Sequence, residues 1–424
     1  MNNLLIRNAR LRDEQELKDI LIIDGKFSKI EAGIPPEAAA GGEVIDAGGC
    51  LVSPPFVDPH VHLDAVLSAS QMPRQNETGT LIEAIGIWND WRPGLTKEVL
   101  KKNAREVVDW YIANGTLRVR THADCTDPTL LTVECLCELR EEVKDLIDIQ
   151  VVAFPQNGIL TNPNHIKLFE RAIEMGADVL GGAPHLELTR EDGVREIEIV
   201  YEYAEKYGKL IDVHCDETGD PDSKFVEVMA KESILRGMGE RSSASHTTAM
   251  HNYNPDYAFK LIGNLAKAKM SIVTNPIANA NLQNRLEGYP KKRGLARIDD
   301  LHARGVNVCI GNDSVMDPWY SLGRASILDT AYFVTHYGHL VGAAQLPLVF
   351  DMTTVNSAKA LALEDYGIQV GNQADMIILD AKNISDAIRL RSECTYVIRK
   401  GKVISTATPA KRVLYNGRNM EFRV

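Results

Sequence analysis

The chain has 424 residues, 44% of them hydrophobic and 25% charged, and its formal net charge is −11. This length and composition suit one large α/β barrel with an accessory piece. The acidic balance provides no basic field that would gather phosphates, so we expect no nucleic-acid partner and favour a small neutral ligand.

The cysteines and the N-terminal residues indicate a cellular compartment. The seven cysteines are odd in number, scattered and mostly placed in apolar runs, which is typical of reduced thiols. The N-terminal stretch carries Arg7, Arg10 and Arg12 and lacks the apolar core of a signal peptide. No uncharged apolar run reaches the roughly 18 residues of a membrane span. We therefore expect a cytoplasmic protein with no membrane partner.

Both ends of the chain read as short strands separated by turns. The N-terminal strands are predicted at Leu4 to Ala9, Lys18 to Ile23, Phe27 to Glu31 and Cys50 to Ser53, with an Asp24-Gly25 hairpin turn. The C-terminal strands are predicted at Met376 to Leu379, Tyr396 to Arg399, Val403 to Ser405 and Val413 to Tyr415. Neither end has enough apolar surface to fold alone, so we expect residues 1–54 and 369–424 to form one small β domain.

Residues 55–368 alternate strand-like apolar runs with helical patterns, which is the signature of βα units. We predict eight strands, at Phe56 to Val61, Leu117 to Thr121, Ile147 to Phe154, Val179 to Ala183, Leu210 to Val213, Ala244 to His246, Ser271 to Thr274 and Val306 to Ile310. Helices are expected between them, for instance at Lys97 to Ala113, Val194 to Glu205 and Lys224 to Arg236. A doubly wound sheet is the alternative, but the count favours a closed (β/α)8 barrel with its active site at the carboxyl ends of the strands.

Polar residues gather at those predicted strand ends. His60 and His62 stand two residues apart after the first strand, so both point to the same side. The other candidates follow later strands, namely Gln156, His185, His214, Glu217, His246 and Asp313. Three histidines and an aspartate with no thiolate nearby suit one zinc or iron(II) ion and leave a position for water. The roles of His122 and His185 stay open, because a buried histidine often bonds only a backbone carbonyl.

Five segments together resemble the bacterial cytosine deaminases of the amidohydrolase superfamily. They are the stretches 54–64 (PPFVDPHVHLD), 153–158 (AFPQNG), 212–217 (DVHCDE), 244–251 (ASHTTAMH) and 311–320 (GNDSVMDPWY), and a tail motif at 371–375 (GNQAD) extends the match. The resemblance covers nearly the whole chain. It implies a (β/α)8 barrel with a small β-sandwich built from both termini, and hydrolytic removal of an amine from a pyrimidine-like ring.

The resemblance also implies roles for individual residues. Metal ligation falls to His60, His62, His214 and Asp313, with Glu217 as proton shuttle and His246 and Asp313 activating the water. Gln156 is implied to bind the amide of the substrate, Trp319 to cap the pocket and Leu81 to line it. The chemistry agrees, since the ring nitrogen beside the attacked carbon must gain a proton before ammonia leaves, and a carboxylic acid can supply it.

One residue departs from the family pattern. The ligand aspartate of cytosine deaminases is followed by a second acidic residue, where this chain has Ser314. Because that neighbour is expected near the C5 edge of the ring, a serine leaves a wider and less polar pocket. We therefore expect 5-substituted cytosines such as 5-methylcytosine to be good substrates, with plain cytosine preferred if Ser314 faces only a loop.

Other functions compete with this one. Isocytosine, isoguanine and creatinine also present an amidine-like carbon beside an amide. A cyclic-amide hydrolase such as dihydropyrimidinase or dihydroorotase generally uses two metals bridged by a carbamylated lysine, but residues 181–188 contain no lysine. A non-enzymatic scaffold is disfavoured because every ligand position is filled. The native metal is left open, and a homo-oligomer is expected.

Overall fold

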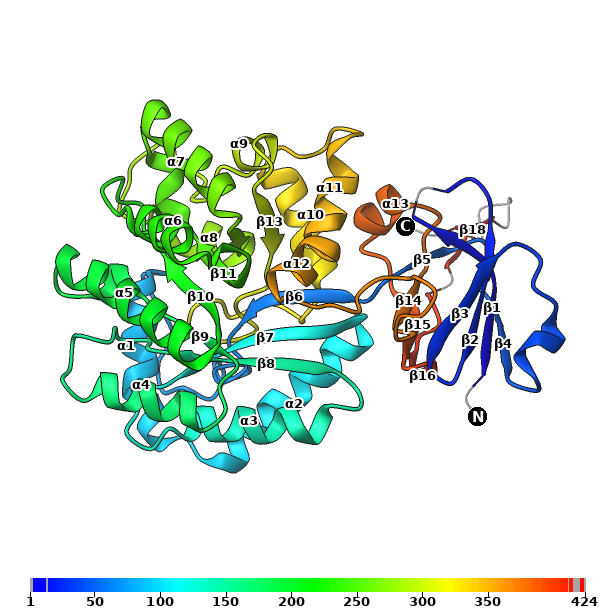
Figure 1. Cartoon of the computed structure of the whole chain (residues 1–424), viewed down its shortest axis with the longest axis horizontal. Coiled ribbons are helices and arrows are strands. Elements are labelled where there is room, and N and C mark those ends of the chain that lie inside the picture. The colour runs from blue at the N-terminus through cyan, green and yellow to red at the C-terminus, as the bar shows by residue number, and fades with distance from the viewer. Residues whose placement is uncertain (1–2, 13, 411, 415–419, 423–424) are drawn as a thin grey trace.

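The structure is a computed structural model that describes residues 3–12, 14–410, 412–414 and 420–422. A barrel occupies most of the molecule, and a smaller β domain beside it is built from segments of the N-terminal and C-terminal parts of the chain (Figure 1). All neighbouring barrel strands are parallel and follow one another in chain order. They are β6 (Phe56–Val61), β7 (Thr116–Asp124), β8 (Asp148–Phe154), β9 (Val179–Leu180), β10 (Leu210–Cys215), β11 (Ser242–His246), β12 (Ser271–Thr274) and β13 (Asn307–Ile310).

A short seam between β6 and the residues after β13 closes the barrel. Val61 and Asp313 form an isolated parallel bridge. The His62 amide donates to the Asp313 carbonyl at 3.0 Å, and the Asp313 amide donates to the His60 carbonyl at 2.8 Å. Three of the four predicted ligand residues, His60, His62 and Asp313, therefore form the seam itself.

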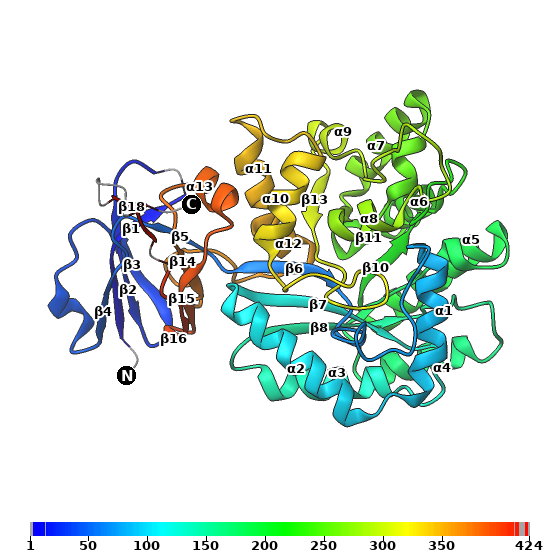
Figure 2. The same ribbon diagram turned by 180° about the vertical axis from the view of Figure 1, so that it is seen from behind.

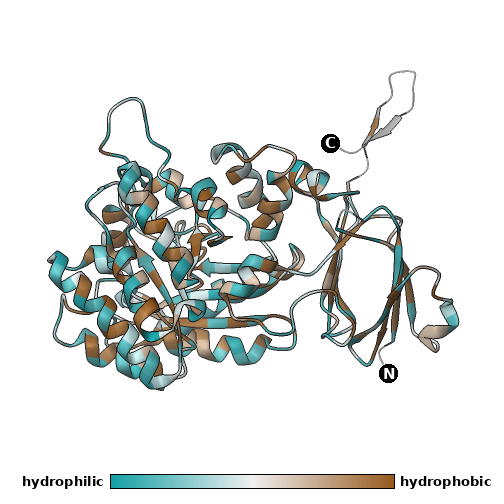
Figure 3. Cartoon of the chain, turned by 45° about the horizontal axis from the view of Figure 1, so that its top comes forward, coloured by the Kyte–Doolittle hydropathy of each residue, from teal (hydrophilic) through white to brown (hydrophobic). Residues whose placement is uncertain are grey.

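Helices lie on both sides of the strands, with α2 and α3 next to β7 and β8 and with α10 and α11 on the opposite side (Figures 1 and 2). Hydrophobic and hydrophilic residues alternate around each helix (Figure 3), as expected where one face packs on the strands. The α-helices are α1 (Leu81–Trp91), α2 (Lys97–Ala113), α3 (Leu131–Val143), α4 (His165–Glu174), α5 (Arg190–Tyr207), α6 (Phe225–Arg236), α7 (Pro255–Ala268), α8 (Pro276–Leu282), α9 (Ile298–Ala303), α10 (Ile327–Tyr337), α11 (Gln345–Met352), α12 (Val355–Ala360) and α13 (Ile384–Leu390).

Local sequence signals set the ends of these helices. Thr80, Thr96 and Thr189 cap α1, α2 and α5 by accepting a hydrogen bond from a backbone amide of the first turn. Short 3-10 helices add η1 (Pro36–Ala39), η2 (Arg92–Gly94), η3 (Pro184–Leu186), η4 (Gly239–Arg241) and η5 (Thr248–Asn252). No helix among the described residues is both long and apolar enough for a membrane span.

Both chain ends contribute to the sheet of the small domain. Its strands are β1 (Leu4–Leu11), β2 (Lys18–Ile23), β3 (Lys26–Glu31), β4 (Glu43–Asp46), β5 (Leu51–Ser53), β14 (Met376–Leu379), β15 (Cys394–Arg399) and β16 (Lys402–Thr406). The order is β16-β15-β14-β5-β1-β2-β3, with β4 paired to β1. Ile6, Ile22, Met376 and Ile398 from the two ends share one apolar core. The predicted fold class is confirmed, whereas the domain boundaries at residues 54 and 369 stay a prediction.

The last predicted strand forms, but it is not part of the eight-stranded sheet of the small domain. We expected Val413 to Tyr415 to belong to that domain, which stays a prediction; among the described residues β17 (Arg412–Leu414) pairs with β18 (Met420–Phe422) in a two-stranded sheet. Tyr415 lies outside the described residues. A run of three apolar or aromatic residues predicts a strand but carries no information about which neighbour it pairs with.

Candidate metal centre and active site

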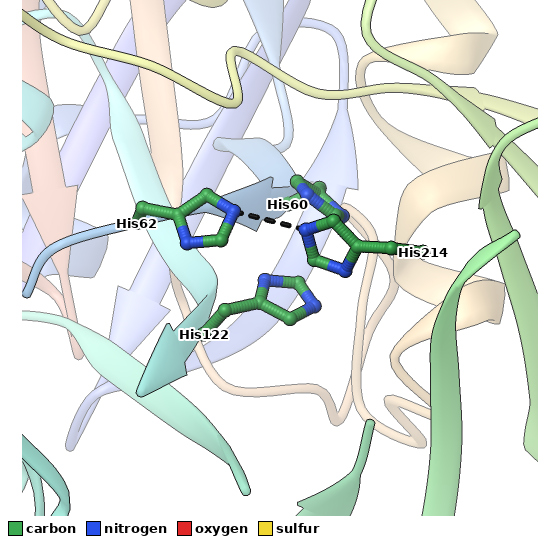
Figure 4. Close-up of side chains that lie close together, drawn as sticks. All are labelled: His60, His62, His122 and His214. Atoms are coloured by element: carbon green, nitrogen blue, oxygen red, sulfur yellow. Dashed lines mark hydrogen bonds between the residues drawn. The ribbon is translucent and has the colours of Figure 1, made fainter. Parts of the chain in front are cut away.

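The barrel gathers a cluster of buried imidazoles at the carboxyl ends of its strands. His60 and His122 belong to β6 and β7, His214 belongs to β10, and His62 directly follows β6. Their rings point toward one another in the barrel interior (Figure 4). The ring centres of His60 and His122 are 4.0 Å apart, and those of His60 and His214 are 4.5 Å apart. We call His60, His62, His122, His214 and Asp313 the imidazole cluster.

Distances within this cluster bring together every metal ligand that the sequence predicted. The Nε2 atoms of His62 and His214 are 3.0 Å apart. The Asp313 Oδ1 atom lies 3.4 Å from His60 Nε2 and 3.6 Å from His62 Nε2. The ligand atoms form two overlapping groups, one made of the four histidines and one made of His60, His246 and Asp313, each within 4.8 Å. The roles of these residues as ligands stay predictions.

The cluster fits a divalent metal. The Nε2 atom of His60 is buried and has no hydrogen-bond partner among the described residues. Burial, followed by the nearby charge of His62, lowers the pKa of His60 well below its usual value, so the ring is neutral and can offer a lone pair. Burial likewise lowers the pKa of His214. Neutral imidazoles beside one carboxylate are ligands that suit zinc or iron(II).

The backbone is unusual where two of the predicted catalytic residues lie. His246 and Asp313 have φ angles of +69° and +66°, in the left-handed region that residues with a Cβ rarely adopt. His246 is the last residue of β11, and Asp313 lies three residues beyond β13. Such strain is often found at functional sites, where the surrounding structure maintains it.

Glu217 lies beside the imidazole cluster on the loop after β10. The loop is fixed by Asp216, whose carboxylate accepts hydrogen bonds from the amides of Phe225 and Val226 at 2.8 and 2.9 Å. Glu217 Oε1 lies 3.5 Å from His246 Nδ1. Burial and then the charge of Asp313 raise the pKa of Glu217 well above its usual range, which favours the protonated form of this carboxyl.

A cavity of about 690 Å³ reaches Glu217 from outside, and Leu81 and His185 also line it. Trp319 stacks on His62 with ring centres 5.9 Å apart and planes 23° apart. Gln156 is buried two residues beyond β8.

Ser314 is buried beside Asp313 but lines a different cavity, of about 280 Å³, with Asn312, Tyr320 and Thr330. The binding roles of these side chains stay predictions.

The sequence reasoning missed several polar neighbours of the cluster. Asn279 Nδ2 lies 2.8 Å from His246 Nδ1, and Ser245 Oγ lies 2.9 Å from His60 Nδ1. Asn279 belongs to a helix, and no spacing rule relates it to a strand end. Ser245 directly precedes His246, and regular strand alternation predicts that the two side chains point to opposite faces. A pattern that places His246 at the site therefore does not predict the contact of Ser245 with His60.

Comparison with known proteins identifies the family. The profile of the amidohydrolase family matches residues 43–405, so the chain belongs to that family. The predicted superfamily, the predicted resemblance to its cytosine deaminases and the predicted class of enzyme, a hydrolase of carbon–nitrogen bonds, are confirmed.

The similar proteins include several deaminases. The crystal structure of 5-methylcytosine deaminase from Klebsiella pneumoniae bound to 5-fluorocytosine is 42% identical, covers 98% of this chain and 100% of its own, and has a TM-score of 0.94. N-isopropylammelide isopropyl amidohydrolase from Pseudomonas sp. (strain ADP) is 30% identical over 95% of this chain and 97% of its own. Pterin deaminase from Rhizobium rhizogenes is 29% identical over 93% of this chain and 90% of its own.

Proposed function

We propose that the protein is a metal-dependent deaminase of a free pyrimidine base, either cytosine or a 5-substituted cytosine such as 5-methylcytosine. The products would be the corresponding uracil or thymine and ammonia. The observation that carries this proposal is the buried Glu217 carboxyl, which lies 3.5 Å from His246 Nδ1 and beside the imidazole cluster. The similarity to 5-methylcytosine deaminase over the full chain supports it.

The proposed centre holds one zinc or iron(II) ion through His60, His62, His214 and Asp313. When bound, such an ion supplies a hydrolytic nucleophile by lowering the pKa of water to near 7. Around it, Asp313 accepts a proton from the attacking water and His246 orients that water by a hydrogen bond. Glu217 donates its proton to the ring nitrogen, takes up the proton of the hydroxyl that has added to the ring carbon, and passes that proton to the leaving amine. The proton held by Asp313 then returns to Glu217, so both carboxyl groups regain their starting state.

Substrate recognition is assigned to Gln156, Trp319 and Leu81, and of these three Leu81 lines the 690 Å³ cavity that reaches Glu217. Gln156 offers both a donor and an acceptor, which match a ring N–H beside a carbonyl. Trp319 covers the cluster through its contact with His62, and Leu81 lines the cavity that leads to Glu217. A neutral base needs no cationic partner, which agrees with the acidic net charge of −11.

Ser314 is proposed to widen the pocket at the C5 edge of the ring. It follows Asp313 directly but lines a cavity of about 280 Å³ that is separate from the one reaching Glu217, so the proposal rests on its position beside Asp313. One methyl group in an apolar pocket is worth about 1 to 3 kcal/mol, or roughly 10- to 200-fold in discrimination. The ratio of kcat/KM for 5-methylcytosine over cytosine should therefore fall by about that factor in Ser314→Asp. An unchanged ratio would show that Ser314 does not control this edge.

The reaction itself is tested by ammonia release from a panel of rings. Cytosine and 5-methylcytosine should release ammonia, and isocytosine, isoguanine and creatinine serve as competing amidines. Dihydrouracil and dihydroorotate test the cyclic-amide hydrolases through formation of the ring-opened acid, because opening these rings releases no ammonia. If ammonia comes only from a competing ring, or a cyclic amide is opened instead, the proposed substrate is wrong. A homo-oligomer in the cytoplasm also stays a prediction.

A further inference from the structure

A series of buried hydrogen-bonded side chains connects Arg120 to His60 of the imidazole cluster. Ser245 Oγ lies 2.9 Å from His60 Nδ1, and the same hydroxyl donates to Asp212 Oδ1 at 2.5 Å. Arg120 Nη1 in turn donates to Asp212 Oδ2 at 3.1 Å. All four side chains are fully buried, so water does not compete for these hydrogen bonds.

The chemistry of these groups fixes the direction of each hydrogen bond. Arg120 can only donate, so Asp212 Oδ2 accepts from it, and Asp212 Oδ1 accepts from the Ser245 hydroxyl. The Ser245 hydroxyl has a single hydrogen, and Asp212 receives it. Ser245 Oγ must therefore accept from His60, which places the imidazole proton on Nδ1.

A neutral imidazole carries only one ring proton, so its other nitrogen then bears a lone pair. In His60 that nitrogen is Nε2, which lies 3.4 Å from Asp313 Oδ1 and has no hydrogen-bond partner among the residues that the structure describes. We infer that Ser245 and Asp212, held by Arg120, are positioning residues that fix the Nδ1–H tautomer of His60 and keep its Nε2 available to a metal. This inference rests on the proposed ligation by His60, not on the identity of the substrate.

The neighbouring residue Ser243 provides a matched control. It lies two residues before Ser245 on the same strand β11, is equally buried, and accepts from Arg120 Nη1 at 3.3 Å. No hydrogen bond joins Ser243 to His60 among the described contacts. Removing each hydroxyl in turn therefore separates a role toward His60 from a role in the ion pair.

Zinc binding by the metal-free full-length chain tests the inference through competition with a chromophoric chelator. Loss of an outer partner of a metal-binding histidine typically weakens metal binding by about 10- to 100-fold, and we expect that loss in Ser245→Ala. Ser243→Ala should bind zinc like the wild type. Ser245→Thr keeps the hydroxyl, so it should restore the affinity.

The substitution Asp212→Asn should reverse the direction of the hydrogen bonds that Ser245 makes with residue 212 and with His60. Arg120 can only donate, so the amide oxygen must face Arg120 and the amide nitrogen must face Ser245. The Ser245 hydroxyl then accepts from the amide and donates to His60 Nδ1, which moves the imidazole proton to Nε2. We expect this variant to bind zinc more weakly than Ser245→Ala, because it favours the wrong tautomer.

The outcomes distinguish three cases. If Ser245→Ala binds zinc as tightly as Ser245→Thr and Ser243→Ala, the inference is wrong even though the metal centre stands. A folded Asp212→Asn protein that binds zinc no more weakly than Ser245→Ala would overturn the assigned proton direction. A wild-type chain that binds no zinc overturns both the metal centre and this inference. The serine variants retain the ion pair, so they decide the question even where Asp212→Asn does not fold.

Discussion

The barrel interior contains two buried polar clusters that differ in how fully their hydrogen bonds are satisfied. In the first, which we call the ion-pair cluster, Arg120 donates to Gln150 Oε1 at 3.0 Å, to Asp212 Oδ2 at 3.1 Å and to the Ala360 carbonyl at 2.9 Å. In the imidazole cluster, the Nε2 atoms of His60 and His122 are buried without a hydrogen-bond partner among the described residues.

This difference separates a structural role from a binding role. A buried polar group without a partner costs about 1 to 3 kcal/mol, so a fold retains such groups where a ligand can satisfy them. The hydrogen bonds of the ion-pair cluster are complete as they stand, so this cluster should affect stability, and metal binding only through the contact of Asp212 with Ser245. The imidazole cluster is incomplete and should affect mainly ligand binding and turnover.

Metal removal should have the largest effect, and only on the imidazole cluster. We expect close to one zinc or iron per chain by elemental analysis. Chelation should lower turnover more than about 10³-fold, because water keeps a pKa near 15.7 instead of about 7 without the metal. Added zinc should restore ammonia release. Two metals per chain, with activity following the second, would contradict the single-metal centre.

The substitution Glu217→Gln should have the next largest effect, a loss of kcat. Loss of a general acid or base typically costs about 10²- to 10⁴-fold in kcat, while metal content and the unfolding midpoint should not change. Glu191→Gln, on the exposed first turn of α5, is the control for a generic loss of one carboxylate. A Glu217→Gln enzyme that retains more than about a tenth of the wild-type kcat would remove Glu217 from the proton transfer.

Arg120→Met tests the ion-pair cluster by leaving Asp212 buried and unpaired. Breaking one side of a buried ion pair costs about 3 to 5 kcal/mol, which we expect in the free energy of unfolding of the metal-free protein in urea. Replacing both partners, as in Arg120→Met with Asp212→Leu, should recover most of that loss. A single variant as stable as the wild type would show that the pair contributes little.

The last prediction concerns the pH dependence of stability and the buried residue Asp317, two residues before Trp319. Asp317 Oδ1 accepts from the amides of Trp319 and Tyr320 at 3.0 Å each, and burial raises the pKa of Asp317 to about 8. The pKa of Asp317 is higher in the folded protein than in the unfolded chain. Its contribution to the free energy of unfolding is therefore fully present below about pH 4 and is lost as the pH rises through 8.

Asp317→Asn retains the acceptor oxygen but does not titrate. The difference in unfolding free energy between wild type and Asp317→Asn should therefore fall with rising pH, by at most about 1.4 kcal/mol per pH unit, and level off above pH 8. Urea denaturation from pH 5 to above pH 8 measures this difference. A constant difference across that range would show that Asp317 is already ionised at pH 5.

Much of the fold follows from the sequence because barrel strands are strongly patterned. All eight predicted strands are present within a few residues, and the polar residues at their ends converge as the geometry of a parallel barrel requires. The Asp24-Gly25 turn also forms, with φ angles of +49° and +77° as a two-residue hairpin needs.

The ion-pair cluster was not predicted, although a signal for it exists. Arg120 lies two residues before His122 on β7, and Asp212 lies two residues before His214 on β10, so each charged residue shares a face with an imidazole. Opposite charges on the same face of two strands indicate an internal pair. The contact of Asn279 with His246 depends on how α8 packs, which no local pattern specifies.

The seam that closes the barrel has a consequence for slow motions of the backbone. The amides of His62 and Asp313 donate two hydrogen bonds that join the end of β6 to the residues after β13. Both residues are also proposed ligands. An ion held between them would tie the two edges together, so opening of the seam would require its release. Hydrogen exchange of these two amides should therefore slow when zinc is added. The exchange rate of these backbone groups would then measure whether zinc occupies the site.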